Sequence, residues 1–236
     1  MGSMTKIDAQ DGGSFDAYVA SPAKSSAPGL VLMQYICGVN KVMRDIADDF
    51  ASKGFLVACP DLFWRQEPNV QLNDDPANPS PEHFQRALEL NDGFDDEAAI
   101  MDLASTLDFL RSHDSCSGKV GVVGYCLGGR TAYLMAARTN ADCSVGYYGV
   151  NIQGYLDEAD NINNPLMLHL AGNDEFCPPD IAATIVDRLA PLAQTTLFEY
   201  EGAGHAFALA GGPNYNESAS NLANQRSLTF LKDQLF

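Results

Sequence analysis

The chain has 236 residues, enough for one large domain with a substantial core, and residues 1–236 are read as a single domain. Its 14 basic and 31 acidic residues give a net charge of −17, which repels nucleic acid and anionic membranes. We therefore expect a soluble, cytoplasmic monomer or small homo-oligomer with neither nucleic acid nor a membrane as partner. The first four residues, MGSM, read as a possible tag remnant.

Apolar runs that alternate with helical patterns predict an α/β fold, with a mostly parallel central sheet and helices on both faces. Near-continuous apolar runs are typical of strands buried on both faces, and they occur at 29–34, 55–59, 119–124, 144–149, 165–172 and 195–200. Helical spacing of apolar residues predicts helices at 39–50, which ends before Gly54, and at 100–110. Residues 219–236 read as a closing helix.

Residues 62–81 break this pattern, because they are rich in Pro, Asn and Asp and contain the only Trp. A long irregular stretch inside a compact domain is more often a functional lid or binding loop than a linker. We predict a lid-like loop here.

Six cysteines are scattered along the chain without a C-x-x-C pair, which argues against a zinc ribbon or a thioredoxin motif. Neither a metal nor a cofactor is expected. Cys59 and Cys143 lie in or beside apolar runs, where a thiol is commonly a small buried hydrophobe.

Cys126 is the exception, because it occupies the central position of Gly124-Tyr125-Cys126-Leu127-Gly128. This Gly-x-Nuc-x-Gly pattern is typical of a nucleophile elbow, in which a sharp turn between strand and helix exposes the nucleophile. The strand-like KVGVV precedes it and the helix-like LGGRTAYLMAAR follows it, as an elbow requires. The sequence therefore predicts Cys126 as a nucleophile.

A histidine base and an orienting carboxylate follow in the chain order nucleophile, acid, histidine that strand–turn–helix hydrolases use. Asp174 comes just after the strand at 165–172, and His205 just after the strand at 195–200. His169 lies inside an apolar strand and is expected to be a hydrogen-bonded core residue, while His83 and His113 are expected to face solvent. We predict Cys126, His205 and Asp174 as the catalytic residues.

Acyl transfer also needs two N–H donors for the developing oxyanion. One is the N–H of the residue after the nucleophile, Leu127, and the other is expected from the loop after an early strand, where we favour Ile36. A thiolate at a helix N-terminus is a strong nucleophile, and its thioester suits esters and lactones better than amides. A small-molecule ester or lactone is the expected substrate.

Taken together, QYICGVN, ACPDLFWR, VGVVGYCLGG, VGYYG, GNDEFCPP and GAGHAFA make the chain similar to the dienelactone hydrolase family from about Phe15 to Leu235. The resemblance implies an α/β-hydrolase fold, a Cys126-Asp174-His205 triad and an oxyanion hole formed by Ile36 and Leu127. The family opens an unsaturated lactone that bears a carboxylate.

The chain differs from the family's pattern at three positions. Where this chain has Tyr35, the family has a glutamate that interacts with the resting thiol. Where this chain has Leu209, the family has an arginine that binds the substrate carboxylate. For the family's second carboxylate-binding arginine, the only arginine of this chain near the corresponding position is Arg86. We therefore predict a less anionic ester or lactone, with a pocket contributed by Tyr35, Cys37, Trp64, Arg86 and Leu209.

Two alternatives remain open. Class I glutamine amidotransferases also carry a cysteine elbow, but they commonly use His-x-Glu, and here Ala206-Phe207 follow His205. A redox-thiol or binding protein that kept the fold without turnover is the main alternative.

Overall fold

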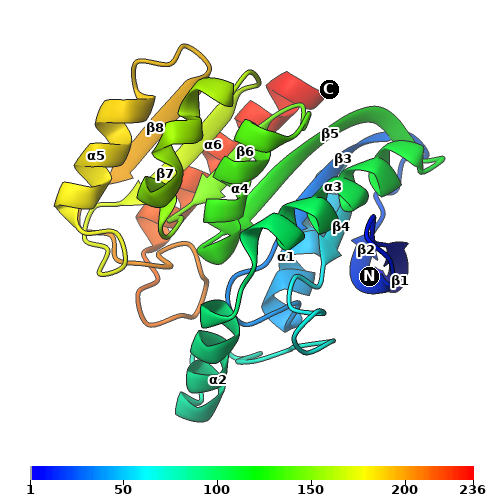
Figure 1. Ribbon diagram of the computed structural model, residues 1–236, viewed down its shortest axis with the longest axis horizontal. Coiled ribbons are helices and arrows are strands. Elements are labelled where there is room, and N and C mark those ends of the chain that lie inside the picture. Colours follow the sequence, from blue (N-terminus) through cyan, green and yellow to red (C-terminus); the bar gives the residue numbers. More distant parts are fainter. Residues whose placement is uncertain (1) are drawn as a thin grey trace. The chain divides into compact units, whose positions relative to one another are not determined.

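The computed structural model describes residues 2–236, which form two compact units, Met1–Val122 and Val123–Phe236. The boundary between the units falls within strand β5 (Cys116–Tyr125). Hydrogen-bonded neighbours in the sheet follow the order β1-β2-β4-β3-β5-β6-β7-β8. Figure 1 labels these elements.

The first unit begins with an antiparallel hairpin of β1 (Ser3–Asp8) and β2 (Ser14–Ala20), in which Ser3 pairs with Val19 and Met4 with Tyr18. Strand β2 pairs antiparallel with β4 (Leu56–Pro60), which pairs parallel with β3 (Ala27–Met33). Met1, part of the possible tag remnant, lies outside the described residues. The hairpin was not predicted, because β1 is mostly exposed and lacks an apolar run.

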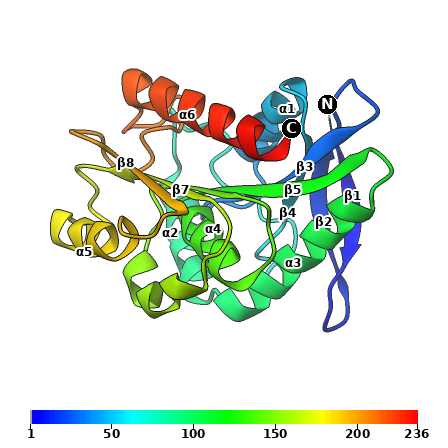
Figure 2. The same cartoon turned by 90° about the horizontal axis from the view of Figure 1, so that it is seen from above.

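Three helices complete the first unit: α1 (Lys41–Ser52), α2 (Pro81–Asp92) and α3 (Asp96–Ser112). At the start of α1 the side-chain oxygen of Asn40 accepts from the N–H of Met43, and at the start of α2 the hydroxyl of Ser80 accepts from the N–H of His83. Helices α1 and α3 lie on opposite faces of β3 and β4 (Figure 2). Between β4 and α2 the chain forms turns, with one antiparallel bridge between Gly38 and Gln71.

The second unit carries three parallel strands, β6 (Ser144–Tyr147), β7 (Leu166–Ala171) and β8 (Thr195–Tyr200). The remaining elements are α4 (Leu127–Arg138), the 3-10 segment η1 (Ile152–Asn161), α5 (Pro179–Leu189) and α6 (Glu217–Leu235). Figure 2 shows α6 on one face of β7 and β8 and α5 on the other. Within each unit helices therefore cover both faces of the strands, and the predicted α/β fold is confirmed.

The six predicted strands are all present as β3 to β8, with ends that differ by a few residues. The strand predicted at 144–149 ends at Tyr147, because Tyr148 adopts a φ of 37°, which extended backbone does not allow. Among the described residues no helix is long and apolar enough to cross a membrane.

Candidate active site

Cys126 lies at a sharp turn between β5, which ends at Tyr125, and α4, which begins at Leu127. Its φ is 56° and its ψ −112°, a conformation that non-glycine residues rarely adopt and that costs of the order of 1–3 kcal/mol. Its N–H donates to the carbonyl oxygen of Tyr147 at 3.0 Å, and its own carbonyl accepts from the N–H of Gly129 at 2.9 Å. Strained backbone held by its neighbours is typical of a functional site.

Glycine is required on both sides of this turn. A Cβ atom added at Gly124 would overlap the carbonyl group of Gly128, and one added at Gly129 would press on the backbone of Tyr147 and Gly149. Strand and helix therefore approach at backbone contact. This close packing is the physical reason for the Gly-x-Cys-x-Gly-Gly spacing in the sequence.

Asp174 and His205 come together at the ends of two adjacent strands, β7 and β8. The Nδ1 atom of His205 lies 2.9 Å and 3.1 Å from the two carboxylate oxygens of Asp174. Both residues are buried, with exposed fractions of 7% for His205 and 4% for Asp174. A bond from the N–H of Asn173 to the carbonyl of Ala203, at 2.9 Å, joins the two loops that carry them.

Two aromatic rings flank the imidazole of His205. The ring of Tyr148 lies 5.2 Å from it and that of Phe176 4.8 Å, both edge-on at about 70°. The N–H of Phe176 also donates to Asp174 at 2.9 Å, so one residue orients the carboxylate and packs on the imidazole. Neither aromatic residue is among the predicted site residues, although Phe176 lies two positions after Asp174 and its exposure of 48% is high for a phenylalanine.

The pKa of His205 is raised from 6.5 to about 10. Burial acts in the opposite direction and lowers it, but the negative charge of the Cys126 thiolate and hydrogen bonds to Asp174 and Cys126 outweigh burial. The surroundings of His205 therefore favour its imidazolium form.

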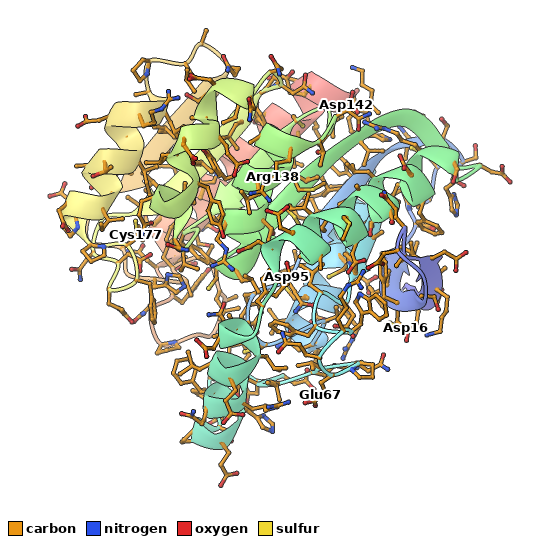
Figure 3. The ribbon with its side chains drawn as sticks, in the orientation of Figure 1. Asp16, Glu67, Asp95, Arg138, Asp142 and Cys177 are labelled. Carbon is orange, nitrogen blue, oxygen red and sulfur yellow. The ribbon has the colours of Figure 1, made fainter. Side chains whose placement is uncertain are left out.

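The other described thiols differ in their surroundings. Cys177, labelled in Figure 3 in the loop before α5, has a pKa raised to about 11 by burial and by the charge of Asp174. Burial raises the pKa of Cys59 further. Neither of these two thiols ionises near neutral pH.

His169 is a core residue, as predicted. Its Nδ1 lies 2.8 Å from the Tyr200 hydroxyl and its Nε2 2.7 Å from that of Ser227, and burial lowers its pKa to about 3. His83 is exposed and His113 partly exposed. Among the described residues, no group of three or more His, Cys, Asp and Glu side chains could hold a metal ion.

Of the predicted oxyanion donors, Leu127 is the first residue of α4 and is fully buried. Ile36 lies in the loop between β3 and α1 and is partly buried. Beside it, the Tyr35 hydroxyl accepts a hydrogen bond from Asn40 Nδ2 at 2.7 Å and is bonded to the Cys37 side chain, while burial raises the pKa of Tyr35.

The remaining predicted substrate contacts have structural partners of their own. Trp64 Nε1 donates to Asp102 at 2.7 Å, and its ring packs against that of Phe15 at 5.9 Å. Arg86 is exposed and pairs with Glu89 and with Glu67, which Figure 3 labels. Leu209 closes the turn that begins at Ala206, since its N–H donates to the Ala206 carbonyl, and it is partly buried.

A cysteine elbow after one strand of a mostly parallel sheet, followed by an aspartate and a histidine at later strand ends, defines an α/β hydrolase. The model of the dienelactone hydrolase family matches residues 15–235, and the chain belongs to that family. It is a hydrolase that acts on ester bonds, those of lactones included.

The chain is 42% identical to a candidate carboxymethylenebutenolidase of Azospirillum brasilense over 231 residues, which are 97% of each protein. It is 39% identical to a carboxymethylenebutenolidase of Pseudomonas putida, covering 95% of this chain and 94% of that protein. A crystal structure of a candidate dienelactone hydrolase from Klebsiella pneumoniae matches with a TM-score of 0.83 at 26% identity, covering 98% of both chains.

Proposed function

We propose that this protein hydrolyses carboxylic esters or lactones with Cys126 as nucleophile, His205 as acid and base, and Asp174 as the residue that orients His205. The observation that carries the proposal is the bond between His205 Nδ1 and Asp174 at 2.9 Å, with a pKa of His205 raised by the Cys126 thiolate. Because Asp174 occupies Nδ1, the Nε2 atom exchanges protons with the reactants.

In the acylation step the Cys126 thiolate attacks the carbonyl carbon, and a C–S bond forms as the carbonyl oxygen becomes an oxyanion. The N–H groups of Ile36 and Leu127 stabilise that oxyanion. Collapse breaks the ester C–O bond, and the leaving alkoxide takes the proton from His205. An acyl-thioester on Cys126 remains.

In the deacylation step His205 Nε2 takes a proton from water, and the resulting hydroxide attacks the thioester. The C–S bond then breaks, the acid product leaves, and the thiolate and imidazolium form again. One water is consumed in each turnover, and no cofactor is needed.

We propose a substrate that is less anionic than a carboxylate-bearing dienelactone. Leu209 carries no charge, and Arg86 is already paired with Glu67 and Glu89. A bidentate contact between arginine and a carboxylate is hard to replace, so a carboxylate on the substrate would add little to its binding energy here.

Mass spectrometry of the enzyme mixed with a neutral chromogenic ester tests the mechanism. We expect an acyl adduct on Cys126 and loss of turnover in Cys126→Ala. Cys143→Ala removes a thiol that is fully buried in the same unit and should keep turnover within about twofold. Unchanged turnover in Cys126→Ala would refute the nucleophile.

A comparison of kcat/KM between neutral esters and a carboxylate-bearing lactone tests the substrate class. Clear preference for the anionic lactone would contradict the proposal. Labelling of Cys126 by dimedone without any turnover would support the redox-thiol alternative instead.

A further inference from the structure

The loop that carries Ile36 is bonded to a distant segment of the chain. We call residues 69–74, which precede α2, the strap. The N–H of Leu72 donates to the carbonyl oxygen of Cys37 at 2.9 Å, and the N–H of Lys41 donates to Asp74 at 2.6 Å. The strap therefore follows the β3–α1 loop (residues 35–40) from its middle to its end.

Asn40 joins three parts of this arrangement through one side chain. Its Oδ1 accepts from the N–H of Met43 at 3.2 Å and caps α1. Its Nδ2 donates to the Tyr35 hydroxyl and to the Leu72 carbonyl, each at 2.7 Å, and more weakly to the Asn73 carbonyl at 3.3 Å. Asn40 has no exposed surface, so these partners replace water completely.

The strap and the loop are also in backbone contact. Gly38 has a φ of 78°, and a Cβ added there would overlap the carbonyl oxygen of Val70. Arg44 adds a bond from its guanidinium to Gln71 and another, at 2.7 Å, to the carbonyl of Val39. This packing leaves no room for the loop to shift unless the strap moves with it.

Ile36 lies between the two residues that these contacts hold. On one side the Tyr35 hydroxyl is bonded to Asn40, and on the other the Cys37 carbonyl is bonded to the strap. An oxyanion donor is effective only when its N–H is fixed before the negative charge develops, and a displacement of about 1 Å can cost a hundredfold in rate.

We propose that Asn40 is a positioning residue for ester and lactone hydrolysis, because its side-chain amide clasps the β3–α1 loop to the strap and so fixes the direction of the Ile36 N–H. This inference rests on the proposed function, in which Ile36 is an oxyanion donor. The strap is then a fixed part of the site.

Asn40→Asp is the most informative variant. It keeps an oxygen that can cap α1 but replaces the Nδ2 donor with an acceptor that faces the Leu72 carbonyl. Asn216→Asp is the matched control, because Asn216 Oδ1 caps α6 through the N–H of Ala219 at 3.0 Å. The control makes the same chemical change at a helix start outside the loop and the strap.

We expect kcat for a neutral ester to fall by about 10- to 100-fold in Asn40→Asp, with a smaller change in KM and a normal rate in Asn216→Asp. The rate at which iodoacetamide alkylates Cys126 should change by less than about twofold, because alkylation forms no oxyanion. An unchanged kcat, or an equal fall in both rates, would overturn the inference.

Hydrogen exchange at the amides of residues 36–38 tests the clasp without any substrate. We expect faster exchange in Asn40→Asp than in the parent or in Asn216→Asp, and equal exchange would contradict the clasp. If Asn40→Asp does not fold, Asn40→Ser keeps a capping hydroxyl and should show the same changes. A parent enzyme that lacks esterase turnover would refute the proposed function. The exchange result would still show whether Asn40 holds the β3–α1 loop against the strap.

Discussion

Replacing Cys126 with alanine should lower the pKa of His205. Burial alone would hold that pKa below 6.5, yet the Cys126 thiolate and the bonds to Asp174 and Cys126 raise it to about 10. At about 1.4 kcal/mol for each pKa unit, the rise corresponds to about 5 kcal/mol of preference for the imidazolium. One opposite charge at close range contributes about 1–3 units, so the pKa should fall by about that amount in Cys126→Ala.

Nitrogen NMR of the imidazole rings measures this shift directly, because the chain has only four histidines. His169, whose pKa is about 3, provides an internal reference that substitution at Cys126 should leave unchanged. A neutral His205 ring at pH 8 in the parent, or equal His205 pKa values in parent and variant, would refute the ion pair.

The same pair predicts how stability depends on pH. Because folding raises the pKa of His205, its contribution to stability is fully present below about pH 6.5 and is lost as pH rises through about 10. Urea unfolding across this window should show a steeper loss of the free energy of unfolding in the parent than in Cys126→Ala. Equal slopes in the two proteins would contradict the assignment.

Three further changes test the surroundings of the site. Asp174→Asn should lower both the His205 pKa and kcat/KM, the latter by roughly a thousandfold, which NMR titration and steady-state assays would measure. Gly124→Ala should reduce the free energy of unfolding by about 2 kcal/mol or more, measurable in urea, because its Cβ overlaps Gly128. Folding lowers the pKa of His169, so its contribution to stability is present above about pH 6.5 and is lost as pH falls towards 3. His169→Gln should reduce the slope of the free energy of unfolding against pH by up to about 1.4 kcal/mol per pH unit. An unchanged slope in urea unfolding would argue against a neutral buried His169.

Much of the fold and the elbow can be predicted from the sequence because local rules decide them. Strands buried on both faces must be continuously apolar, which identifies β3, β4, β6, β7 and the second half of β5. Strand β8 is mostly only partly buried, so burial on both faces does not explain its sequence. The glycines around Cys126 follow from backbone contact between β5 and α4. His169 could be separated from His205 because one lies inside an apolar strand and the other follows a strand end.

The contacts that the sequence did not reveal are non-local. Trp64 and Arg65 both donate hydrogen bonds to Asp102, which lies almost forty positions later in the chain. No spacing rule predicts a contact over that distance in sequence. The bonds between the strap and Asn40 likewise span more than thirty positions. Helix α2 did carry a local signal, Ser80 followed by Pro81, but the irregular stretch before it concealed where the helix begins.

Tyr35 bears on how the thiol is activated. Its hydroxyl is bonded to Asn40 and Cys37, and burial raises its pKa, so it is neutral near pH 7 and accepts no proton from a thiol. In the proposed mechanism the proton of Cys126 has His205 as its acceptor. In that mechanism the charges of the Cys126 thiolate and the His205 imidazolium stabilise each other. A thiol that His205 deprotonates needs no charged group on the substrate for its ionisation, so the proposed mechanism agrees with an uncharged Leu209 four residues after His205.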